Sequence, residues 1–187
     1  MNSAADTSPV RRVHLWRIIG WGGAVALVLS PLVAMQFTTE VNWDETDFIF
    51  AMVIFGVVGG LIELAVRFSS NWYFRFGAIF AVLAGLIVVW ANLAVGMIGN
   101  EDNAVNLLFG GVLMIAVLGA IFARFHPYAV ASAMLFAGLT QAAIGLFAGV
   151  FGTDPRGGIF TIILASFWLI SAALFRSASV GREIRVA

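Results

Sequence analysis

The sequence contains no cysteine and no lysine. Without cysteine, the chain cannot form a disulfide framework, a thiolate metal site or a cysteine nucleophile. Without lysine, it cannot form a Schiff base, which excludes retinal-type photochemistry. Charge is scarce as well: 11% of the 187 residues are charged, against about 25% in an ordinary soluble domain. Two of the side chains that carry covalent catalysis, cysteine and lysine, are therefore missing.

Hydrophobic residues dominate what remains, at 61% of the chain. They form runs of about 20 residues, the length that an α-helix needs to cross a lipid bilayer. We therefore predict an all-α integral membrane protein with a compact bundle of six transmembrane helices. The predicted spans are residues 17–36, 47–66, 76–98, 104–123, 128–150 and 158–175. Residues 1–16 are then an N-terminal segment, 17–176 the transmembrane domain and 177–187 a C-terminal tail.

Basic residues are distributed unevenly between the two ends of these spans. Nine of the ten arginines fall on one side: Arg11, Arg12, Arg17, Arg67, Arg75, Arg124, Arg176, Arg182 and Arg185. The other side is rich in acidic residues and carries Arg156 as its single arginine. Because arginine-rich connections remain in the cytoplasm, we predict that both termini are cytoplasmic.

Glycine is frequent inside the predicted spans, as at Gly56, Gly59, Gly60, Gly110, Gly111, Gly145 and Gly149. Small residues allow helix backbones to approach closely in lipid. This packing can join helices of one chain, or it can join the chain to a partner. The spacing of the glycines does not separate these two uses.

Glu63 lies clearly within a predicted span. A lone carboxylate in hydrocarbon is costly, which makes it a candidate proton or cation relay. However, Arg67 follows four residues later, on the same face of the helix, where the two side chains can form a structural pair. We favour the pair.

A polar stretch runs from the end of the third span into the fourth. It contains Asn92, Asn100, Glu101, Asp102, Asn103 and Asn106. Carboxylate and amide oxygens are ligands for a hard cation, so this stretch is a candidate ion site. The spacing does not match the twelve-residue calcium loop. We favour a turn whose Asp102 or Asn103 caps the next helix.

The same stretch also carries a family resemblance. Its residues Asn92 to Gly96, the pair Ile98-Gly99 and the run from Glu101 to Asn103 resemble an uncharacterised family of small multi-pass bacterial inner-membrane proteins. Weaker similarity extends to Arg67, Ser69, Ser70 and Asn71. The resemblance covers the second to fifth spans. It implies a multi-pass location in the inner membrane, and it carries over no activity, substrate or catalytic residue.

Other polar residues suggest weaker possibilities. Thr140 and Gln141 lie near the middle of the fifth span, and Gln141 could line a narrow polar path together with Glu63 and Asn92. His14 and His126 are the only histidines, and a haem held by two imidazoles would need both. Both fall at the edge of the predicted membrane domain, so we expect no haem.

We therefore predict a non-enzymatic membrane protein that acts by association, as an accessory or assembly subunit or as a homo-oligomer. The alternative is a small ion or solute transporter that uses Glu63, Asn92 and Gln141. An enzyme ranks third, because no span holds a histidine or a recognised nucleophile motif. The expected partners are membrane lipids, other membrane-protein subunits or a second copy of the chain. We expect no metal, no cofactor and no nucleic acid.

Overall fold

The computed structural model describes residues 9–100, 102–152 and 154–186, without the side chains of 9–14, 16 and 181–186. Within these residues every regular element is helical, and six helices are long and apolar enough to cross a membrane. This confirms the predicted all-α class and six helices that could each span a membrane. The helices belong to two compact units, residues 1–60 and 61–187, which are described separately.

The first unit contains α1 (Pro9–Ala34) and most of α2 (Glu45–Phe68). α2 begins at a reciprocal cap. Asp44 Oδ1 accepts backbone hydrogen bonds from Thr46 and Asp47, and Asp47 Oδ2 accepts one from the Asp44 amide. The Asp44 side chain thereby satisfies two backbone amides of the helix start, and the Asp47 side chain satisfies a third. The ring of Trp21, on α1, lies against Gly59 of α2.

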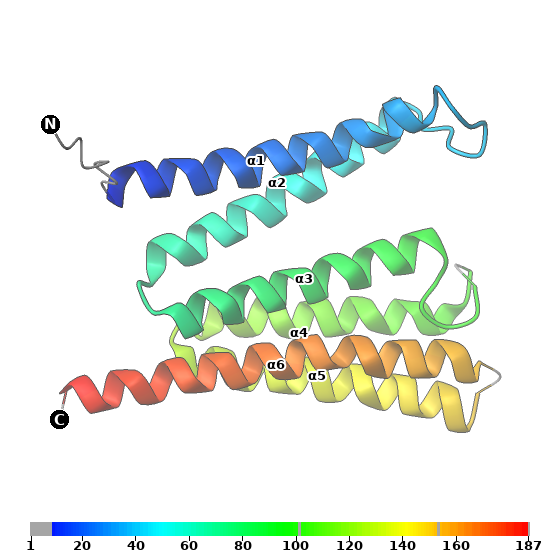
Figure 1. The fold of residues 1–187 in the computed structure, drawn as a ribbon. Coiled ribbons are helices and arrows are strands. Elements are labelled where there is room, and N and C mark those ends of the chain that lie inside the picture. The colour runs from blue at the N-terminus through cyan, green and yellow to red at the C-terminus, as the bar shows by residue number, and fades with distance from the viewer. Residues whose placement is uncertain (1–8, 101, 153, 187) are drawn as a thin grey trace, which may run out of the picture. The chain divides into compact units, whose positions relative to one another are not determined.

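The second unit contains the end of α2, then α3 (Trp72–Ala94), the 3₁₀ turn η1 (Ala104–Leu107), α4 (Leu108–Phe122), α5 (Pro127–Val150) and α6 (Pro155–Val186). Short connections join consecutive helices, so neighbours along the chain run antiparallel (Figure 1). α5 and α6 are packed along their length, and α6 also packs on α3. α6 therefore has neighbours on two sides.

The core of the second unit is built around aromatic residues of α3 and α6. Phe74 and Phe175 meet edge to face with ring centroids 5.0 Å apart. Trp168 is 2% exposed in the same cluster. A second cluster, nearer the α3–α4 turn, includes Met97 and Phe109, each at most 1% exposed. The turn is thus anchored in the core.

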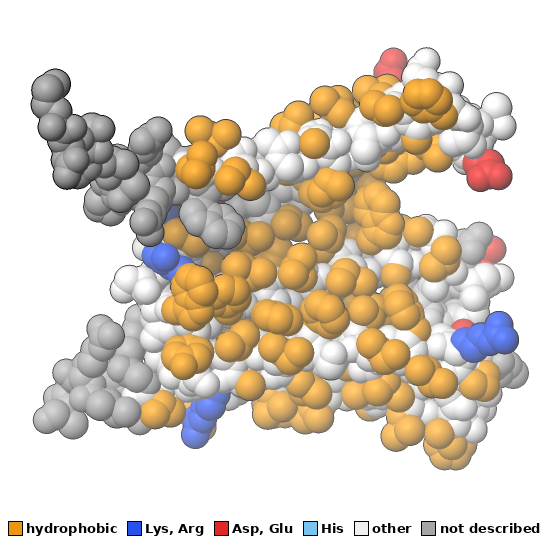
Figure 2. All heavy atoms as spheres, in the orientation of Figure 1, with side chains coloured by type: hydrophobic (Ala, Val, Ile, Leu, Met, Phe, Trp, Pro, Cys, Tyr) orange, Lys and Arg blue, Asp and Glu red, His pale blue; other side chains and the backbone are white. Residues whose placement is uncertain are grey.

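The outward surface of this unit is apolar. Figure 2 shows hydrophobic side chains covering the middle of the visible face of α3–α6, with charged side chains at the two ends. Large exposed residues such as Met114, Phe136 and Ile163 are 57–62% accessible. An apolar belt between charged ends is the surface that a lipid bilayer requires.

Most helix boundaries differ from the predicted spans, and two of these differences have a clear physical cause. α3 ends at Ala94 instead of residue 98, because Gly96 has a φ of +75°, which an α-helix does not allow. α6 extends to Val186, beyond the predicted end at residue 175. Its final turns contain Arg182 and Arg185, which are tolerated there because they lie past the apolar stretch that ends at Val180.

Candidate functional site

The predicted polar stretch folds around the side chain of Asn106, which is 4% exposed. Its Oδ1 accepts hydrogen bonds from the amides of Met97 and Ile98, at 3.1 and 2.9 Å. Its Nδ2 donates to the carbonyls of Ile98 and Asn100, at 3.3 and 2.6 Å. One amide side chain therefore satisfies four backbone groups of the turn. These groups need such a partner because they lie outside a helix.

Two glycines make this wrapping geometrically possible. Gly96 and Gly99 have φ values of +75° and +72°, in the left-handed region that favours glycine. A Cβ at Gly96 would collide with the backbone of Asn100. The turn consequently depends on glycine at this position for both its conformation and its space.

Asp154 ties the start of α6 to the same turn. Its Oδ2 accepts a hydrogen bond of 2.7 Å from the Gly99 amide, and its Oδ1 accepts one of 2.9 Å from the Gly157 amide. These backbone bonds, to Gly157 first and then Gly99, lower the pKa of Asp154 below its ordinary value of 3.8. In the sequence this carboxylate counts only among the acidic residues of the arginine-poor side, although Asp before Pro155 is typical of an N-cap followed by N1.

Two other residues of the predicted ion site, Asn92 and Asn103, form hydrogen bonds within the turn. Asn103 caps η1, with its Oδ1 accepting a 3.0 Å hydrogen bond from the Val105 amide. Asn92 donates to the backbone carbonyl of Asn106 at 3.2 Å, while its own Oδ1 is buried without a partner. Asp102 is exposed, and Glu101 lies outside the described residues. Asn106 has its amide groups fully used, so it offers no free oxygen to a cation.

Glu63 and Arg67 form an ion pair on α2, with Arg67 Nη2 2.8 Å from Glu63 Oε1. The side chain of Glu63 is 24% exposed and that of Arg67 is 67% exposed. The long side chain of Arg67 can thus place its charge toward the membrane–water interface while it neutralises the Glu63 carboxylate.

Gln141 is fully buried between α5 and α6. Its Nε2 donates to the Thr161 carbonyl at 3.3 Å, and its Oε1 accepts a 2.9 Å hydrogen bond from the Trp168 indole. Ser171 makes a parallel link to α3 through the Gly77 carbonyl, at 2.8 Å. Sequence reasoning missed Thr161 and Ser171, since a single hydroxyl in an apolar run has no distinguishing pattern. These bonds join α5 to α6 and α6 to α3.

The structure separates the glycines into two sets. A Cβ at Gly145 would lie 2.8 Å from the Gly158 carbonyl oxygen, so Gly145 is needed where α5 crosses α6. Gly59 packs under Trp21 in the same manner. In contrast, a Cβ at Gly56 or Gly60 would meet no atom within 4 Å, and both glycines are exposed on α2. Gly110 and Gly111 are also open, on α4.

The histidines and acids offer no metal centre within the described residues, where no three His, Asp or Glu side chains cluster. His126 is exposed, with Nδ1 3.1 Å from the Ala123 carbonyl oxygen. The side chain of His14 lies outside the described residues, so the expectation about haem is not tested.

Comparison with protein-family models, curated proteins and solved structures gave no significant match to this chain. The resemblance to a bacterial inner-membrane family therefore stays a prediction.

Proposed function

We propose that this protein resides in a bacterial inner membrane, with both termini in the cytoplasm, and acts there by lateral association with another membrane helix. The orientation is supported by the nine arginines predicted on one side. No enzymatic step is part of the proposal.

The observation that carries the association is the open pair Gly56 and Gly60 on α2. The two glycines are four residues apart, so they lie one above the other on one face of the helix. Glycines at this spacing allow a second backbone to approach closely, and such contacts drive helix association in lipid. The other open glycines, on α1 and α4, include no two at this spacing.

A transporter is less well supported by the polar residues. Glu63 is neutralised by Arg67, whereas Asn92 and Gln141 are bonded to different groups in the second unit. Asn92 bonds to the α3–α4 turn and Gln141 bonds across the α5–α6 interface. Neither observation favours a continuous polar path.

The absence of cysteine provides a direct test of the association face. Single cysteines at position 56 or 60 can carry a photoreactive maleimide in isolated membranes. We expect a covalent adduct from both positions, either with a second copy or with a partner that mass spectrometry identifies. The matched control is Leu61→Cys, because residue 61 is exposed but lies about 140° around the helix from residue 56.

Gly56→Leu should then abolish the adduct formed from position 60 without lowering the melting temperature, since the new side chain enters open space. Gly145→Leu is the contrasting variant. It should lower the melting temperature by forcing α5 away from Gly158. Equal adducts from positions 56, 60 and 61 would indicate random collision and refute the association face.

A further inference from the structure

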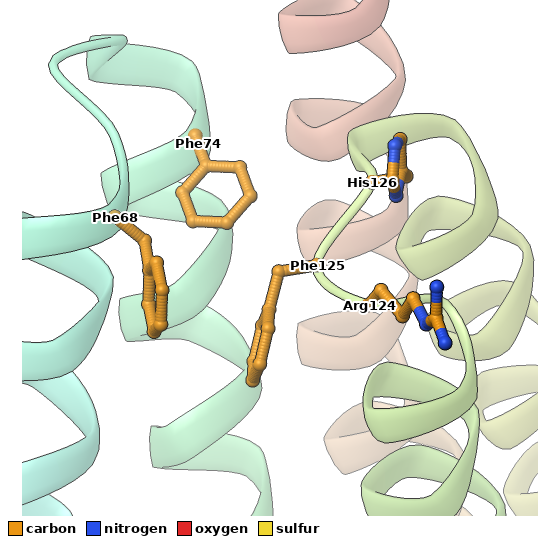
Figure 3. A pocket seen from close by; sticks show the side chains of 5 residues that line it. All are labelled: Phe68, Phe74, Arg124, Phe125 and His126. Atoms are coloured by element: carbon orange, nitrogen blue, oxygen red, sulfur yellow. The ribbon is translucent and has the colours of Figure 1, made fainter.

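A cavity of about 190 Å³ opens beside the connection between α4 and α5. It is lined by Phe68, Phe74, Arg124, Phe125 and His126. Phe68 and Phe125 stack with ring centroids 5.1 Å apart and nearly parallel planes. Figure 3 shows these rings facing each other near Phe74, whereas Arg124 and His126 project from the other side of the connecting loop. The site therefore has an aromatic side and a cationic side.

The backbone of this loop holds the two sides apart. α4 ends in a tight turn in which the Arg124 amide bonds to the Ile121 carbonyl and the Phe125 amide bonds to the Ala120 carbonyl. Arg124 and Phe125 have φ values of 46° and 59°, a conformation that residues with a Cβ rarely adopt. Glycine usually occupies such a helix end. The chain instead places an arginine and a phenylalanine there, in a strained conformation that directs them to opposite sides.

Arg124 differs from the other described arginines near this end of the second unit. Arg67 pairs with Glu63, and Arg176 lies over the Tyr128 ring with its Cζ 4.5 Å from the centroid. Arg75 donates to two backbone carbonyls at 2.8 and 3.1 Å. Among the described residues, the exposed guanidinium of Arg124 has no hydrogen bond, ion pair or ring contact. Its charge is available to a ligand.

The position of the loop defines where that ligand lies. α4 and α5 are both candidate membrane spans, so the four residues between Phe122 and Pro127 lie at the level of the lipid headgroups. The start of α5 has no acidic residue in its first turn and no side-chain cap, which keeps the positive end of the helix dipole unneutralised. The Arg124 guanidinium and the positive end of α5 on this side of the cavity therefore suit an anion.

We propose that this cavity binds the headgroup of an anionic phospholipid. The Arg124 guanidinium pairs with the phosphate, for which its planar fork of donors is suited. The Nε2 of His126 is the second polar contact: because Nδ1 donates to the Ala123 carbonyl, Nε2 accepts a hydrogen bond from a headgroup hydroxyl. Phe68 and Phe125 receive the first carbons of the acyl chains, because their exposed rings face the apolar side. A free phosphate ion would use only the cationic side, so the aromatic side favours a lipid.

The test is thermal unfolding of the full, delipidated chain in dodecylmaltoside with added phosphatidylglycerol, phosphatidylcholine or inorganic phosphate. Arg124→Gly is the informative variant, because glycine accepts the left-handed conformation without strain. Its melting temperature without lipid should be equal to or above that of the unchanged protein. The control is Arg156→Gln, which removes an exposed arginine in the first turn of α6, at the opposite end of the second unit.

We expect phosphatidylglycerol to raise the melting temperature of the unchanged protein and of Arg156→Gln, and to raise that of Arg124→Gly by less. Lipid titration should show about fivefold weaker affinity for Arg124→Gly, the factor that corresponds to one arginine near a membrane surface. Arg124→Asn, which also tolerates this conformation, is the second variant if Arg124→Gly is destabilised without lipid. An equal rise with phosphatidylcholine, with phosphate alone or in both Arg124 variants would overturn the proposal, as would no rise with phosphatidylglycerol.

Discussion

At the scale of single residues, Asn106 is the centre of the α3–α4 turn. Its amide group replaces the helical partners that Met97, Ile98 and Asn100 lack. Only an asparagine fits this role, because it has both an acceptor and two donors on a short side chain. The turn is therefore a structural device before it is a binding site.

Asn106→Ala should destabilise the protein strongly, because it removes four hydrogen bonds and leaves backbone groups unpaired in a buried turn. Each lost bond costs about 1 kcal/mol, so we expect a loss of roughly 2–4 kcal/mol in reversible unfolding. Asn100→Ala is the control, since only the backbone of Asn100 is used. A similar loss in both variants would contradict the role of the Asn106 side chain.

Asp154 makes the same turn sensitive to acid. Its pKa is lowered in the folded state, so its contribution to stability is complete above the unfolded value of 3.8 and is lost as pH falls through the folded pKa. The stability difference between the unchanged protein and Asp154→Asn should therefore be constant above about pH 5 and shrink below about pH 4. Melting temperatures across this range provide the measurement. A difference that persists at low pH would show that the charge of Asp154 is irrelevant.

At the scale of elements, α2 differs from the helices of the second unit. α5 and α6 bury 39% and 44% of their most apolar stretches, whereas α2 buries 11%. The difference arises because α5 and α6 bring glycines together at their crossing, whereas Gly56 and Gly60 of α2 face open space. α2 consequently leaves more surface for lipid or a partner helix than α5 or α6 does.

Glu63 and Arg67 stabilise α2 as an i,i+4 pair, and this role can be measured separately from any relay function. In a double-mutant cycle with Glu63→Gln and Arg67→Gln, we expect a coupling of about 0.5 kcal/mol, typical of exposed helical pairs. Each single substitution should lower the free energy of unfolding by a comparable amount, measured by thermal or denaturant unfolding. If the two substitutions had strictly additive effects on stability, the ion pair would contribute nothing, and Glu63 would again be a candidate proton relay.

At the scale of the whole molecule, the predicted orientation remains to be measured. Reporter fusions after Arg67, Arg124 and Arg185 should all report the cytoplasm, and a fusion after Asp102 should report the opposite side. The reason is the retention of arginine-rich connections on the cytoplasmic face. Periplasmic activity of the fusion after Arg185 would exclude an even number of spans with a cytoplasmic N-terminus.

The sequence alone was sufficient to predict the helical class and the six apolar segments, because length and hydrophobicity are local properties of a membrane helix. It also placed Glu63 near Arg67, since four residues on one helix are neighbours in any fold. The end of α3 was predicted less well. A run of apolar residues continues past Ala94, and only the left-handed Gly96 stops the helix.

Tertiary structure decided which of these residues meet across the fold. Asp154 reaches the Gly99 amide, 55 residues away along the chain, and no local pattern encodes that hydrogen bond. The same holds for the glycines: Gly145 and Gly56 look alike in sequence, yet one is filled by a neighbouring helix and the other is open. The physical reason is that a glycine's role depends on what lies opposite it, which only the packing of the helices determines.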